Sequence, residues 1–195
     1  MENEILKYIS KYVTITKDLE KSILESACIK IFPKGTLLLK EGSISNECYF
    51  ILKGCIRCYY LKNGEEKTTE FYTEGQAAIA SCYGKKIPSG QYLECLEETV
   101  ASVGNPELEA TMFQKYPQSE SATRVMTEMI MVNNQDTLAE FKMASPEERY
   151  LNLLKNRPEL MNRVPQHQIA SYLGLKPESL SRIRKRIMRK NIIPQ

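Results

Sequence analysis

Short β-prone runs separated by glycine-containing turns are the feature that most constrains the fold of this chain. The runs cover residues 29–32, 36–40, 48–53, 55–61, 67–72, 77–80, 92–96 and 99–103. Asn63-Gly64 stands between two of them, and this dipeptide is typical of a β-hairpin because both central residues of a type I′ turn take positive φ. Strands this short, with a turn roughly every eight to twelve residues, favour an antiparallel barrel or sandwich.

Helical periodicity replaces the strand pattern on both sides of this region. Apolar residues recur at helical spacing within residues 3–12, 17–28, 107–115 and 119–143. The last of these ranges contains neither glycine nor proline, which predicts one long helix. Ser145-Pro146 then begins a new helix, since serine is a good N-cap and proline is tolerated in the first turn. Glu148 completes a capping box with Ser145.

The predicted long helix carries an apolar stripe with alternating three- and four-residue spacing. The stripe consists of Ala122, Val125, Met129, Val132, Ala139 and Met143, with Asp136 as a polar interruption. Such spacing is typical of a coiled-coil seam. A single stripe that faces the core of its own protomer gives the same pattern. We favour a seam between two copies of the chain, because a long helix between two small domains exposes much of its length.

The charge of the chain is distributed unevenly. Residues 146–195 contain 11 lysines and arginines and 4 acidic residues, a net charge of +7, whereas the other 145 residues carry 16 − 20 = −4. A basic module joined to an acidic one suggests that the C-terminal part binds a polyanion.

Within this basic part, residues 164–184 divide into helix, turn and helix. Gly174 provides the positive φ of a tight turn, and Pro177 begins the second helix. Apolar residues at helical spacing hold both helices to a core, which leaves polar side chains outward. The outward residues are Lys176, Glu178, Ser179, Arg182 and Arg186, with Gln166 and His167 at the start of the first helix.

This outward face is chemically suited to the major groove of double-stranded DNA. Arginine can donate two hydrogen bonds to guanine, and glutamate can accept one from cytosine, as expected for Arg182 and Glu178. Ser179, Gln166 and His167 lie near helix N-termini, where phosphates bind readily. A surface ion pair between Glu178 and Arg182 is the alternative interpretation.

The sequence gives little support for metal binding, catalysis or membrane insertion. The six cysteines are scattered, and the Cys55-x-x-Cys58 pair falls on a predicted strand, where residues three apart point to opposite faces. With His167 as the sole histidine, we expect no metal site, no catalytic dyad and no cofactor, and hence no enzyme. No apolar run is long enough to span a membrane, and no secretory signal is present, so we expect a cytoplasmic protein.

Several motifs together resemble the Crp/Fnr family of transcription regulators. They are FPKGTLL at residues 32–38, KEG at 40–42, YFILKGCIR at 49–57, FYTEG at 71–75, EERY at 147–150 and IASYLGLKPESLSR at 169–182. The resemblance covers nearly the whole chain. It implies an α+β protein with an N-terminal cyclic-nucleotide-binding-like antiparallel β-roll, a long dimerisation helix and a C-terminal winged helix-turn-helix. It assigns base contacts to Glu178 and Arg182 and a phosphate contact to Ser179. Pro177 stands where cAMP-responsive members have a base-reading arginine, so the operator does not carry over.

The effector region departs from the family pattern. Members that bind cyclic nucleotides have a Gly-Glu pair and a phosphate-binding arginine, and both are missing from residues 76–96. Lys85 and Lys86 lack the two-pronged fit of a guanidinium to phosphate. We therefore expect the β-roll to sense another small molecule or to be vestigial, and a regulator that binds cAMP or cGMP through a non-standard phosphate site is the alternative. If the resemblance holds, an effector pocket would contain Tyr72, Glu74, Ser81, Tyr83, Arg124 and Glu128.

These observations predict three units: a β-roll with N-terminal helices over residues 1–117, a dimerisation helix over 118–144 and a DNA-binding domain over 145–195. The wing that follows the recognition helix is expected to be truncated, because the sequence stops at Gln195. The expected partners are double-stranded DNA, a second copy of the chain, an unidentified effector and, for an activator, RNA polymerase.

Overall fold

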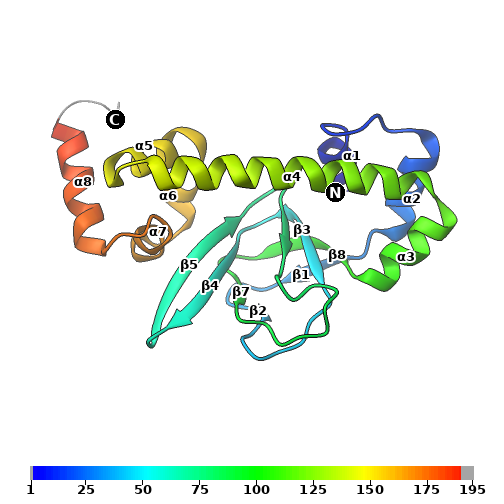
Figure 1. The fold of residues 1–195 in the computed structure, drawn as a ribbon, viewed down its shortest axis with the longest axis horizontal. Coiled ribbons are helices and arrows are strands. Elements are labelled where there is room, and N and C mark those ends of the chain that lie inside the picture. Colours follow the sequence, from blue (N-terminus) through cyan, green and yellow to red (C-terminus); the bar gives the residue numbers. More distant parts are fainter. Residues whose placement is uncertain (1, 190–195) are drawn as a thin grey trace.

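The computed structural model describes residues 2–189, in which two antiparallel sheets are flanked by helices at both ends (Figure 1). The strands are β1 (Ile29–Phe32), β2 (Leu37–Leu39), β3 (Cys48–Lys53), β4 (Ile56–Lys62), β5 (Glu65–Tyr72), β6 (Ala77–Ile79), β7 (Tyr92–Cys95) and β8 (Thr99–Gly104). The helices are α1 (Glu2–Ile9), α2 (Lys17–Ser26), α3 (Pro106–Lys115), α4 (Gln118–Met143), α5 (Pro146–Asn156), α6 (Leu160–Arg163), α7 (Gln166–Tyr172) and α8 (Pro177–Arg189).

The strands form two four-stranded sheets with the orders β1-β8-β3-β6 and β2-β7-β4-β5, and every pairing is antiparallel. The predicted antiparallel β-rich domain is therefore confirmed. The predicted hairpin joins β4 to β5, where Lys62 pairs with Glu65. Asn63 and Gly64 between them have φ of 55° and 78°, the positive values that a type I′ turn requires.

Three apolar clusters hold the molecule together. The first fills the space between the two sheets, where Tyr49, Ile51 and Leu93 are among its buried members. The second joins α1, α2 and the start of α4 to Leu52 and Val100 of the first sheet. The third lies within α5 to α8 and extends to Cys55, Phe71 and Leu96 of the β-rich domain.

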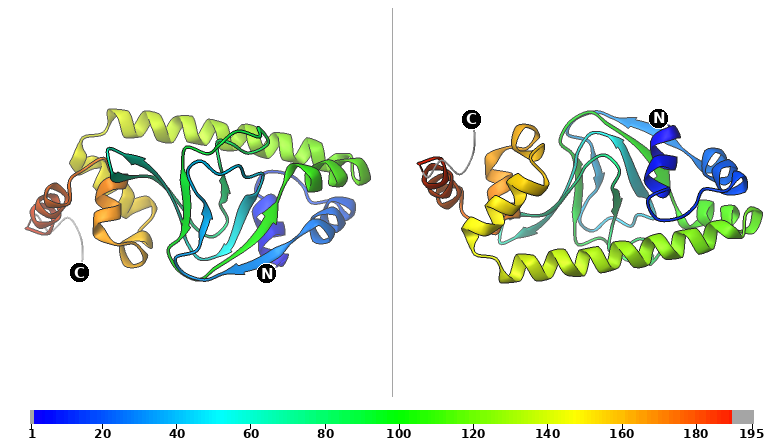
Figure 2. Two further views of the ribbon diagram at one scale, coloured as in Figure 1. Left: turned by 90° about the horizontal axis from the view of Figure 1, so that it is seen from below. Right: turned by 90° about the horizontal axis from the view of Figure 1, so that it is seen from above.

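Helix α4 runs along one edge of the molecule, from α2 and α3 at one end to α5 at the other (Figure 2). Every residue from 131 to 143 is exposed. Within the apolar stripe, Val132 is 51% exposed and Met143 is 79% exposed, whereas Ala122 is only 8% exposed because it packs into the second cluster. The stripe is thus open to solvent in its C-terminal part, and the assignment of Ala122 to a seam between protomers is wrong.

The helix boundaries differ from the predicted ones mainly near the N-terminus, where α1 ends at Ile9 and not at residue 12. The start of α5 agrees with the prediction. The Ser145 hydroxyl accepts a hydrogen bond from the Glu148 N–H at 3.3 Å, and the Glu148 carboxylate accepts one from the Ser145 N–H at 2.7 Å. Among residues 2–189, no helix combines the length and the apolar character needed to cross a membrane. The predicted truncated wing falls on residues 190–195, outside the described part.

Candidate nucleic-acid interface

Helices α7 and α8 are joined by a tight turn at Gly174. This glycine has φ of +70°, and a Cβ added to it would lie 3.4 Å from an Arg149 nitrogen. Ala170 is fully buried, which lets the helices approach closely. Leu180 and Ile183 fix α8 to the same apolar cluster as Ile169. The local sequence therefore builds a rigid two-helix unit that presents the opposite side of α8 to solvent.

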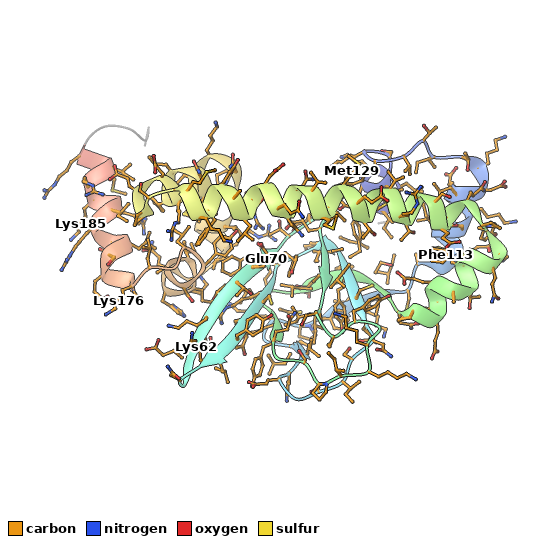
Figure 3. All side chains as sticks on the ribbon, viewed as in Figure 1. Lys62, Glu70, Phe113, Met129, Lys176 and Lys185 are labelled. Carbon is orange, nitrogen blue, oxygen red and sulfur yellow. The ribbon has the colours of Figure 1, made fainter. Side chains whose placement is uncertain are left out.

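The exposed side of α8 lies at the end of the molecule away from α2, where Lys176 and Lys185 project outward (Figure 3). Glu178 and Arg182, one turn apart, are exposed, and Ser179 is half-buried. Within residues 2–189, Glu178 and Arg182 form no ion pair with each other. Both charged groups thus remain available to an external partner.

The remaining predicted contact residues differ in their surroundings. Gln166 and His167 are exposed at the start of α7. Arg186 is exposed as well, but its guanidinium forms an ion pair with Glu147 of α5. An ion pair between two partly exposed side chains contributes little to stability, so Glu147 competes with an external anion for Arg186 without excluding it.

Three other basic residues of the C-terminal part are occupied within the molecule. Arg149 donates hydrogen bonds to the carbonyl oxygens of Ala144 and Leu173, both at 3.1 Å, and stacks on the ring of Phe141 at 4.3 Å. It thereby joins the end of α4 to the turn before α8. Arg149 is one of the 11 basic residues behind the predicted polyanion-binding charge, but in the structure its guanidinium is occupied by contacts between α4 and the turn before α8.

Arg157 and Arg163 tie the C-terminal helices to the β-rich domain. Arg157 donates to Glu70 at 2.9 Å and to the Phe71 carbonyl at 2.6 Å. Arg163 donates two hydrogen bonds to Glu74, both at 2.8 Å, and also pairs with Glu97. A two-pronged arginine–carboxylate pair fixes orientation as well as distance. Part of the +7 charge is therefore neutralised by acids of the β-rich domain.

Strand β5 lies at the edge of its sheet, and α7 covers that edge. The backbone N–H of Thr68 donates to the Ser171 hydroxyl at 2.9 Å, and this hydroxyl donates to the Glu66 carbonyl at 3.2 Å. Tyr172 packs beside Phe71, with ring centroids 5.3 Å apart. Helices α7 and α8 with the turn between them, which we call the helix-turn-helix unit for its geometry alone, therefore dock directly on the sheet edge. Figure 3 shows Glu70 at the end of β5 that lies next to α4.

The six residues predicted to form an effector pocket are not brought together. Tyr72 and Ser81 line a cavity of about 630 Å³ between the second sheet, α4 and α7. Glu74 binds Arg163, and Tyr83 lies beside Cys48 and Glu109, outside this cavity.

Arg124 and Glu128 pair with each other on the exposed surface of α4, at 2.8 Å. The prediction of one pocket from these six residues is therefore wrong for four of them. The four were placed by analogy with the family; Glu74 and Tyr83 have neighbours that lie far away in the sequence, whereas Arg124 and Glu128 pair within one turn of α4.

Cys55 and Cys58 occupy different apolar clusters. Cys55 belongs to the cluster around α5 to α8, and Cys58 belongs to the interior between the sheets. Burial raises the pKa of Cys55 to about 12, so its thiol stays protonated at neutral pH. Within the described residues, no group of three histidine, cysteine or acidic side chains is arranged to hold a metal ion.

Comparison with known proteins agrees with this architecture. Residues 29–102 match the family model of the cyclic nucleotide-binding domain. This segment is thus similar to a cyclic nucleotide-binding domain. No curated protein matches the chain in sequence.

Solved structures extend the likeness beyond this domain. FixK2 from Bradyrhizobium japonicum is 17% identical with a TM-score of 0.68, and the match covers 87% of this chain and 88% of that one. The c-di-GMP responsive global regulator CLP of Xanthomonas campestris is 14% identical with a TM-score of 0.65, and the match covers 90% and 93%. The Thermus thermophilus catabolite activator protein is 13% identical with a TM-score of 0.56, and the match covers 96% and 90%. At these identities, the likeness shows a shared fold.

Proposed function

We propose that this chain is a sequence-specific DNA-binding transcription regulator of the Crp/Fnr type, which acts in the cytoplasm as a homodimer and catalyses no reaction. In this proposal residues 1–117 sense a signal, residues 118–144 pair with a second copy and residues 145–195 read DNA. An activating member would in addition contact RNA polymerase.

The observation that carries the proposal is the exposed face of α8. It combines Lys176, Lys185 and Arg189 with the unpaired Glu178 and Arg182, on a helix that Leu180 and Ile183 hold rigidly from behind. A positive helix face with side chains suited to base edges fits the major groove of DNA. The overall resemblance to solved regulators favours the same function.

A second copy of the chain is the best partner for the outer face of α4. Met129, Val132 and Met143 are exposed on this face, together with Ala139. Val125 is half-buried near Leu19 and would lie only at the edge of the interface with the second copy. Contiguous apolar surface on a long helix is typical of an interface, and a two-fold axis would place two copies of α8 about one DNA turn apart, roughly 34 Å.

For the β-rich domain, we favour a small-molecule signal other than cAMP or cGMP. The cavity of about 630 Å³ contains no lysine or arginine among its described lining residues, so nothing there would neutralise a cyclic phosphate. A cyclic-nucleotide sensor remains the second candidate because residues 29–102 match that domain family.

Selection from a random DNA library, followed by gel shifts on the enriched sequences, tests the proposal. We expect a near-palindromic site whose half-sites are one helical turn apart. Calorimetry with cAMP and cGMP decides whether the signal is a cyclic nucleotide or another small molecule. An enriched pool without any consensus would contradict sequence-specific reading, and micromolar binding of either nucleotide would favour the second candidate.

A further inference from the structure

A cavity lies where the β-rich domain, the long helix and the helix-turn-helix unit meet, and we name it the junction cavity. Its walls are Tyr60, Tyr72 and Ser81 of the β-rich domain, Leu138 and Phe141 of α4, and Tyr172 of α7. We propose that the junction cavity binds a small, uncharged aromatic molecule that touches the helix-turn-helix unit itself. The binding claim stands on the cavity alone, whereas its regulatory meaning rests on the proposed function.

The size and the aromatic lining of the junction cavity fit a ligand of this class. Its volume of about 630 Å³ falls within the range of roughly 300–1,000 Å³ that small-molecule sites occupy. Four aromatic side chains line it: Tyr60, Tyr72, Phe141 and Tyr172. Aromatic rings pack well on other rings in offset or edge-to-face geometry, so a planar ring is the complementary shape.

The charges of the lining select against an anion. The one charged residue of the described lining is Glu70, whose Oε1 accepts hydrogen bonds from Arg157 and from the Phe71 N–H. A bound carboxylate or phosphate would lie near this acid and would meet no cation of the lining. The other polar lining groups are neutral hydroxyls and amides, such as Ser81 and Gln91, which can hydrogen-bond a neutral N–H or O–H.

Apolar side chains of α4 are left without cover in the junction cavity. Leu138 is 52% exposed and Phe141 is 37% exposed, although both face the β-rich domain. They point away from Val132 and Met143, because at about 100° per residue Leu138 and Phe141 lie roughly 120° to 180° around the helix from those two side chains. A second copy of the chain on the outer face would therefore leave the junction cavity open, and a ligand would bury these two side chains.

The helix-turn-helix unit forms part of the wall. Ser171, Tyr172 and Gly174 all line the junction cavity, and Ser171 also holds the edge of β5 through Thr68. A ligand between α4 and α7 would contact the DNA-reading unit without an intermediate element. Its occupancy would fix the position of α7, because the ligand would bridge the three modules.

Titration of the ¹⁵N-labelled full chain with indole, followed by amide chemical shifts, tests the proposal in the absence of DNA. Indole is an uncharged planar ring with one N–H donor, and indole-3-acetate carries the same ring with a carboxylate. We expect saturable shifts for indole at residues 69–72, 137–141 and 171–174 together. Indole-3-acetate and cAMP should bind at least tenfold more weakly.

Two variants of α4 locate the binding. Leu138→Trp fills the junction cavity and should weaken indole binding at least tenfold. Gln135→Trp adds the same ring at an exposed position outside the lining and should leave the affinity unchanged. Unaltered spectra up to millimolar indole, shifts that spare residues 171–174, or equal affinity for the anionic probe would each overturn the proposal.

Because this titration contains no DNA, its result is independent of the proposed function. If the chain binds indole but selects no DNA sequence, the proposal for the junction cavity stands and the proposed function is wrong. If it selects a DNA sequence but does not bind indole, the proposed function stands and the proposal for the junction cavity is wrong.

Discussion

The hydroxyl of Ser171 accepts a hydrogen bond from the backbone N–H of Thr68 at 2.9 Å, although the two residues lie 103 positions apart. Thr68 belongs to an edge strand, whose outward N–H groups would otherwise face solvent or a foreign strand. One side chain of the helix-turn-helix unit therefore takes the place of a neighbouring strand. The position of that unit depends on polar contacts with β5 as well as on apolar packing against Phe71.

Replacement of Ser171 by alanine should loosen this docking. The Thr68 N–H loses its acceptor, at a cost of about 1 kcal/mol, the usual net contribution of one hydrogen bond. Hydrogen exchange at Thr68 should become several-fold faster. Ser121→Ala removes a hydroxyl from an exposed position on α4 and serves as the control. Unchanged exchange at Thr68 in the Ser171 variant would contradict the docking role.

The pair of Arg163 and Glu74 should make the docking sensitive to acid. Although burial opposes ionisation, hydrogen bonds from Arg163 and the Gly54 N–H hold the pKa of Glu74 below its ordinary value of 4.5. A depressed carboxyl pKa in the folded state stabilises the fold fully above about pH 4.5, and this stabilisation disappears as the pH falls through the folded-state pKa.

The measurement is the acid dependence of the free energy of unfolding. Glu74→Gln should flatten this dependence below about pH 4.5, since the variant has no carboxyl group to protonate at this position. Glu41→Gln removes an exposed carboxylate from a loop of the β-rich domain and is the matched control. The role assigned to Glu74 is wrong if both variants follow the wild-type profile.

Arg182 and Glu178 should set the sequence preference of the proposed regulator. Arg182→Ala should lower the affinity for the selected site by about 1–3 kcal/mol and relax the preference at one base pair. Lys176→Ala should weaken binding to all sequences about equally and reduce the salt dependence, as expected for a phosphate contact.

Gel shifts on the selected site and on single-base variants of it separate these effects. Arg124→Ala removes an arginine from α4, outside the proposed interface, and should bind like the wild type. If Arg182→Ala lowers the affinity for all sequences equally, without a change in base preference, Arg182 contacts a phosphate and not a base.

The outer face of α4 should control assembly. Val132→Asp places a charge at the centre of the exposed apolar stripe and should shift the chain from dimer to monomer in sedimentation equilibrium. Asn134→Asp introduces the same charge on the opposite side of the helix and should leave the dimer intact. A dimer that persists in Val132→Asp at micromolar concentration would move the interface elsewhere.

Features set by neighbouring residues could be predicted from the sequence. The Asn63-Gly64 turn and the Ser145 capping box follow from backbone preferences of a few residues, so local patterns identify them. Gly174 was predictable for the same reason, since a positive φ favours glycine.

Features set by distant pairs could not be predicted in this way. Arg157 and Arg163 look like any other basic residues of the C-terminal part, and only the fold brings them to Glu70 and Glu74. Ala122 has the correct spacing for the outer stripe, but α2 lies over it. A helical period reveals which residues share a side and not what covers that side.

In the proposed regulator, helix α4 would act as a lever. Its 26 residues span about 39 Å at a rise of 1.5 Å per residue. Arg149 joins its far end to the turn before α8, so a movement of the tip would carry α8 with it. A swing of only about 5° at the other end would displace this tip by about 3.4 Å, the rise of one base pair. The angle between two copies of α4 would then decide which half-site spacing the protein can read.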